Sequence, residues 1–181
     1  MLAADNVADN VSPPFAFVLA TQDNYCKYLA RLRAIPASLA QVEALLRAGC
    51  AAGMLPPLCG MEGVTEQIAT VATGCRGHGQ EKQEKGSSAM FRPCPASSPP
   101  DEKAAKEAEA CALLAGPVAD AFGSLGRCVE AEYVPCIERT RGSSVACRGL
   151  PNGAELYHAC LRFHTGSNAT AEEVGDPWIA F

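Results

Sequence analysis

Apolar residues near the N-terminal third of the chain recur at helical spacing. One set follows the three- and four-residue intervals of a single helix face, namely Tyr25, Tyr28, Leu29, Leu32 and Ile35. Pro36 closes this pattern, because proline removes a helix hydrogen bond and its ring clashes with the preceding turn. The pattern therefore predicts a first helix that ends at Pro36.

A second helix is predicted directly after this proline. Ser38 and Gln41 have the spacing of a capping box, which marks a helix N-terminus. The apolar stripe that follows consists of Leu39, Val42, Leu45 and Leu46. Gly49 and Gly53, followed by the Pro56-Pro57 pair, end it. Two helices with so short a joint predict an antiparallel pair.

The second half of the chain also has helical spacing. Residues 61–74 favour a short helix, and residues 101–134 favour two helices, with a break or kink at Gly116-Pro117. A loop is predicted around Pro135, Gly142 and Gly149. The last helix starts at Asn152, ends at Gly166 and carries on one face Leu156, Tyr157, Cys160, Leu161 and His164. The fold class is therefore all-α, built from antiparallel helical hairpins or a bundle.

The chain divides by composition into a helical region and its flanks. Residues 1–20 form a loose N-terminal segment, residues 21–173 the helical region and residues 174–181 a separate tail. Within the helical region, residues 74–100 are rich in Gly, Ser, Pro and charge, which predicts an exposed loop.

Charge and hydropathy exclude several classes of partner. The net charge of −5 and the lack of a basic block argue against nucleic acid. No apolar run reaches the roughly 18 residues that a membrane-spanning helix needs. The N-terminus lacks the basic start of a signal peptide, and "FAFVLA" is shorter than its apolar core. A cytoplasmic location is the default expectation.

The chain is cysteine-rich, with ten cysteines and no pair at C-x-x-C spacing. Four of them fall inside helical patterns, where cysteine acts as a small apolar residue, namely Cys26, Cys50, Cys111 and Cys160. Reduced, scattered thiols are therefore the first expectation. The alternative is a secreted, disulfide-bonded helical protein, which a titration of free thiols distinguishes.

No recognisable active site emerges from the residues themselves. Cys160 and His164 lie four residues apart on a predicted helix, as two zinc ligands would, but two ligands do not make a zinc site. Cys75 and His78 have ligand-like spacing without a partner pair. H-E-x-x-H, G-x-S-x-G, G-x-G-x-x-G and phosphate-loop motifs are absent from the sequence.

Three stretches together resemble one family of proteins, DUF885. They are "YLARLRAIPASLAQVEALLRAGCAAGMLPP", "AMFRPCPAS" and "EYVPCIERTRGSSVACRGLPNGAELYHACLRFHTGSNATAEE", in the order and spacing of that family from about residue 25 to 173. The resemblance implies a helical protein similar to zinc-dependent peptidases, with zinc and a peptide substrate expected for full-length members. It places Tyr157, His164 and Thr165 near a cleft, without a ligand role.

The resemblance stops at Glu173. Thr170 and Glu173 have the form of a capping box, yet Gly175 and Pro177 follow at once. In the family a long helix follows here, and the motif expected to bind metal, a His-Glu pair and "PGHH", lies further downstream. The expectation is a truncated hydrolase portion, inactive alone and without catalytic or metal residues. A non-catalytic helical binding or scaffold protein is the alternative.

Overall fold

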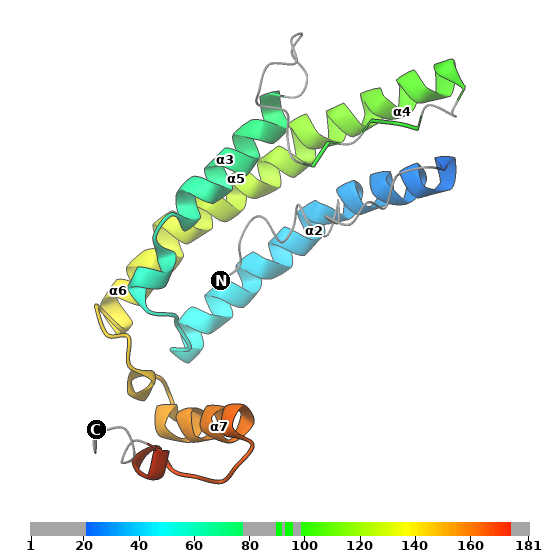
Figure 1. The fold of residues 1–181 in the computed structure, drawn as a ribbon. Helices are drawn as coiled ribbons and strands as arrows, with labels where there is room; N and C mark the ends of the chain where they lie inside the picture. The colour runs from blue at the N-terminus through cyan, green and yellow to red at the C-terminus, as the bar shows by residue number, and fades with distance from the viewer. Residues whose placement is uncertain (1–20, 78–89, 92, 96–98, 175–181) are drawn as a thin grey trace.

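The computed structural model describes residues 21–77, 90–91, 93–95 and 99–174, which form helices and loops with no strand among them (Figure 1). The predicted all-α class is confirmed for this part of the chain. The α-helices are α2 (Gln22–Ala52), α3 (Val64–Arg76), α4 (Pro100–Leu113), α5 (Ala119–Cys128), α6 (Val134–Thr140) and α7 (Gly153–Thr165). Short 3-10 helices, η1 (Leu58–Met61) and η5 (Cys147–Gly149), lie in two of the connections.

Helices α4, α5 and α6 join end to end into one long composite helix. Two π-helical turns connect them, η3 (Leu114–Val118) and η4 (Val129–Tyr133). Pro117 lies inside η3, so the chain does not break at Gly116-Pro117 but passes through a π turn there. Pro135 lies in the first turn of α6, so the predicted loop does not begin at this proline. A π turn is wider than an α turn, which leaves room for the proline ring beside the preceding carbonyl.

Helix α2 and the composite helix run in the same direction. Arg33 pairs with Glu109, and Arg47 further along α2 pairs with Glu132 further along the composite helix. Helix α3 lies antiparallel to both, as Figure 1 shows. The three form an up-down-up bundle, in which α2 and α3 both pack along α5 of the composite helix.

Helix α2 is continuous over 31 residues and contains Pro36. The predicted end at this proline, the restart at Ser38 and the antiparallel pair within residues 25–49 are therefore wrong. The apolar stripe continues in phase, because Ile35 and Leu39 are four residues apart and both are buried. Burying such side chains stabilises by about 1.5–3 kcal/mol each, which offsets the roughly 3 kcal/mol cost of an interior proline. Leu45, expected in the stripe, is exposed.

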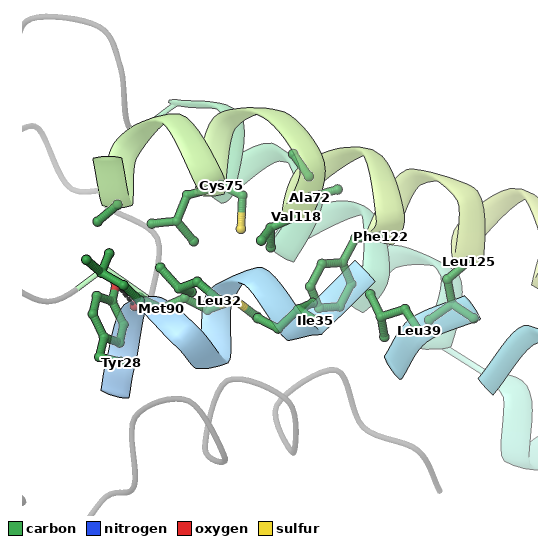
Figure 2. Close-up of a cluster of buried hydrophobic side chains, with 14 of the residues drawn as sticks. Tyr28, Leu32, Ile35, Leu39, Ala72, Cys75, Met90, Val118, Phe122 and Leu125 are labelled. Atoms are coloured by element: carbon green, nitrogen blue, oxygen red, sulfur yellow. Dashed lines mark hydrogen bonds between the residues drawn. The ribbon is translucent and has the colours of Figure 1, made fainter. Parts of the chain in front are cut away.

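The core lies between α2, α3 and the composite helix (Figure 2). The Phe122 ring points from α5 toward α2 and is completely buried. Its neighbours in this cluster come from all three elements and include Leu32, Ile35 and Leu39 of α2, Ala72 and Cys75 of α3, and Val118 and Leu125 of the composite helix. The mixture of small and branched residues matches the Ala- and Leu-rich composition that packed helices need.

Part of the predicted exposed loop at 74–100 belongs to this core. Cys75 lies in α3, and Met90 and Cys94 are also buried. The Tyr28 hydroxyl donates to the Met90 carbonyl oxygen at 2.8 Å, and the Cys94 amide donates to the Glu107 carboxylate at 2.9 Å. These contacts span many residues of sequence, so the local composition gave no sign of them. Residues 78–89, 92 and 96–98 of that loop, like residues 1–20 and 175–181, lie outside the described residues.

Candidate functional site

Helix α7 lies beyond the α6 end of the bundle and carries all the predicted site residues (Figure 1). Arg141, at the end of α6, connects the two parts. Its guanidinium donates to the Leu55 carbonyl oxygen after α2 at 2.6 Å and to the Ala146 carbonyl oxygen before η5 at 2.8 Å. These bonds hold the connection to α7 against the end of the bundle.

The start of α7 is fixed by two unusual backbone positions. Asn152 occupies the predicted cap position with a positive φ of 53°, but its side chain makes no capping hydrogen bond. Gly153 is buried against η5, where a Cβ atom would lie 2.0 Å from the Cys147 carbonyl oxygen. Gly166 ends the helix in the left-handed conformation, as predicted.

The side chains of Tyr157, His164 and Thr165 all lie on the surface of α7. Tyr157 is 47% exposed and His164 is also exposed, with its ring edge-on to Phe163 at 5.1 Å between ring centres. Tyr157 and His164 are seven residues apart and therefore share a face. The Thr165 hydroxyl donates to the Leu161 carbonyl oxygen at 2.7 Å, so it serves the helix end. Their placement near a cleft stays a prediction.

The apolar residues of α7 are not buried as a core stripe. Cys160, predicted to be apolar core, is exposed, and Phe163 is 83% exposed. The reason is that α7 packs against η5 and not against the bundle helices. Along most of α7, therefore, no described element covers the apolar side chains.

A hollow of about 640 Å³ lies between the start of α3 and the loop after α6. Its lining is apolar with two carboxylates and consists of Leu58, Cys59, Met61, Glu62, Gly63, Thr65, Glu66, Val134, Ser143 and Val145. No histidine lies among these residues.

The described residues do not fit a zinc site. No three His, Cys, Asp or Glu side chains gather among them in a way that could hold a metal ion, whereas catalytic zinc has three protein ligands and a water. Cys160 and His164 share the exposed surface of α7 without a third donor there. His78, the possible partner of Cys75, lies outside the described residues.

A cluster of thiols lies where α2 meets the second half of the composite helix. Cys50 of α2 packs against a buried group that contains Tyr133 and Cys136. Burial and a hydrogen bond with the Cys136 thiol raise the pKa of Cys50 to about 11. Burial also raises the pKa of Cys128, the last residue of α5. This cluster differs from the scattered thiols that the sequence predicts.

One signal for the cluster was present in the sequence. Cys128 and Cys136 are eight residues apart, which exceeds two α-helical turns of about 7.2 residues by about one residue. The π turn η4 between them takes up about one extra residue and brings both onto a buried face. The sequence pattern did not reveal the π turn, and without it the two cysteines could not be placed on one face.

The capping box near the end of the described chain is present. The Thr170 amide donates to the Glu173 carboxylate at 2.8 Å, and the Glu173 amide donates to the Thr170 hydroxyl at 3.2 Å. Residues 171–174 are helical, as this reciprocal pair predicts.

We expect Gly153→Ala to release α7 from η5. The added methyl group would meet the Cys147 backbone, so the chain must shift at a cost of about 1–3 kcal/mol. Hydrogen exchange of the α7 amides should quicken by about ten- to hundredfold, while the bundle keeps its melting temperature. Gly116→Ala is the control, since nothing lies within 4 Å of its added Cβ. Unchanged exchange in α7 would contradict this account of the joint.

Comparison with known proteins gives one match. A family model described as "Bacterial protein of unknown function (DUF885)" matches residues 11–176. No curated protein and no solved structure matches the chain. Among the described helices, none combines the length and the apolar character needed to cross a bilayer.

Proposed function

The chain belongs to the DUF885 family, and we propose that it is the helical N-terminal portion of a zinc-dependent, peptidase-like hydrolase, inactive without the metal-binding part. The observation that carries this proposal is the exposed surface of α7. Phe163 is 83% exposed and Tyr157 is 47% exposed on a helix whose main packing partner among the described elements is η5. Large apolar side chains exposed on one helix fit a surface that another part of the protein covers.

In this proposal the chain supplies the scaffold for the cleft. The bundle of α2, α3 and the composite helix is the rigid base, and Arg141 fixes the connection to α7 through the Leu55 and Ala146 carbonyl oxygens. Zinc hydrolysis also needs three protein ligands and a carboxylate that accepts a proton from water. Those groups belong to the downstream region of the family in this proposal, and no catalytic step is assigned to the residues described above.

The proposal predicts that hydrolysis appears only when the two parts are combined. We would purify this chain and, separately, the downstream region of a full-length DUF885 protein that contains the His-Glu pair and "PGHH". Each part alone should leave peptides intact, whereas the mixture should form a complex with bound zinc and hydrolyse peptides. Absence of a complex, or peptide hydrolysis by this chain alone, would contradict the proposal.

Phe163→Ser tests whether α7 is the contact surface. The substitution removes the most exposed aromatic side chain of α7, so complex formation should weaken by about ten- to hundredfold, as expected for an apolar anchor. Leu45→Ser is the matched control, because Leu45 is 71% exposed on α2. Equal affinities for the two variants would rule out a special role for the α7 surface.

A non-catalytic helical binding protein is the second candidate. The observation that favours it is the continuous core, to which α2, α3 and the composite helix all contribute completely buried side chains. A protein of this kind should remain monomeric and unfold in one cooperative transition without any added region. Monomeric, two-state unfolding together with no binding to the downstream region would favour this candidate over the hydrolase portion.

A further inference from the structure

The parallel register of α2 and the composite helix brings two thiols together. Arg47 pairs with Glu132, 85 residues later, through hydrogen bonds of 2.7 and 2.9 Å. Arg141 binds the Leu55 carbonyl oxygen across 86 residues. Cys50 and Cys136 lie between these two cross-links and are also 86 residues apart. The two cross-links fix how α2 is aligned with the composite helix before and after these cysteines. This alignment places Cys50 and Cys136 opposite each other.

The packing around both residues agrees with this register. Cys136 is buried in a group with Leu55, Tyr133 and Ile137, and Cys50 packs against that group. The group forms a separate small core at the α6 end of the bundle. The Cys136 thiol is therefore buried, and the Cys50 thiol is half-buried against the same small core.

We propose that Cys50 and Cys136 form a redox-active pair, which closes into an intramolecular disulfide in the presence of a disulfide oxidant such as oxidised glutathione. The bond ties the C-terminal end of α2 to α6, close to the connection that leads to α7. This device is independent of the proposed hydrolase role, because it needs neither zinc nor a substrate.

The chemistry is a two-step thiol–disulfide exchange. One cysteine thiolate attacks a sulfur of oxidised glutathione, forms a mixed disulfide and releases one glutathione thiolate. The second cysteine thiolate then attacks the protein sulfur and releases the other glutathione. The two protein thiols are oxidised, one glutathione disulfide is reduced to two glutathione molecules, and the two thiol protons pass to the glutathione thiolates or to solvent.

The environment of Cys50 determines how fast this exchange can occur. Burial, the hydrogen bond with Cys136 and the nearby Cys128 raise its pKa to about 11, and Arg139 acts in the opposite direction. The Tyr133 hydroxyl also lies beside Cys50, and burial raises the pKa of that hydroxyl as well. The Cys50 thiolate is therefore scarce at neutral pH, and its fraction rises about tenfold per pH unit below pH 11.

The experiment is oxidation of the reduced, folded chain with oxidised glutathione at pH 7, 8 and 9. Peptide mapping by mass spectrometry should recover the Cys50–Cys136 link, beside any mixed disulfides that form at the exposed Cys26, Cys59 and Cys160. Closure should quicken about tenfold for each pH unit. Loss of thiols through mixed disulfides alone, a bridge between other cysteines or a rate independent of pH would overturn the proposal.

Matched variants separate the pair from a general effect of oxidation. Cys50→Ala and Cys136→Ala should each abolish the bridge, while alanine keeps the small apolar volume of these positions. Cys128→Ala should keep the bridge, although Cys128 belongs to the same thiol cluster. Far-ultraviolet circular dichroism checks that each variant remains helical. A bridge of unchanged yield in Cys136→Ala would overturn the assignment even if the total thiol loss stayed the same.

Discussion

Replacing Phe122 by alanine is expected to destabilise the bundle by about 3–5 kcal/mol, the usual cost of removing a buried phenyl ring. The ring is completely buried among side chains from α2, α3 and the composite helix. Its removal takes away buried apolar surface and leaves a cavity, which the three surrounding helices cannot fill by moving closer. Urea unfolding followed by circular dichroism measures the change directly.

Leu45→Ala is the control for this measurement. Leu45 has a similar apolar character but is 71% exposed on α2, so its truncation should change the free energy of unfolding by less than about 0.5 kcal/mol. A Phe122→Ala cost below about 1 kcal/mol would mean that α5 does not pack against α2 as described. The slope of the unfolding curve should stay unchanged, since both variants expose nearly the same surface on unfolding.

Replacing Pro36 by alanine is expected to stabilise the protein by about 2–3 kcal/mol. Proline in a helix interior costs about 3 kcal/mol relative to alanine, and part of this gain is lost because alanine makes the unfolded chain more flexible. The substitution supplies an amide hydrogen that can bond to the Leu32 carbonyl oxygen within the continuous α2. The same urea unfolding experiment measures the gain.

Pro57→Ala is the matched control with the opposite expected sign. Pro57 precedes η1 with φ −67°, which suits proline, so alanine should cost about 0.4–1 kcal/mol through the unfolded state. If Pro36→Ala instead destabilised the protein, α2 would not be continuous through this position. Two helices joined at Pro36, as the sequence pattern predicts, would give that result.

The helix that carries the predicted site residues follows from the sequence, whereas its exposure does not. Tyr157, His164 and Thr165 lie on one helix as expected, and the Thr170–Glu173 capping box forms as its spacing predicts. These features depend on contacts within a few residues. The exposure of α7 could not be predicted in the same way, because an amphipathic pattern does not say which element covers its apolar face.

The sequence by itself determined the helical class, the ends of α2 and α7 at Gly53 and Gly166, and the capping box. Each of these follows from local spacing and backbone preference, with energies of about 1 kcal/mol that act over a few residues. These local preferences can be predicted from the sequence without knowing which residues are neighbours in space.

The tertiary structure alone decided the continuity of α2 through Pro36, the burial of Met90 and the meeting of Cys50 with Cys136. In each case residues far apart in sequence bury apolar surface together. The summed burial of several side chains exceeds the cost of one proline or of ordering a polar loop segment. This total stabilisation depends on which residues meet in space, so a local sequence pattern cannot predict it.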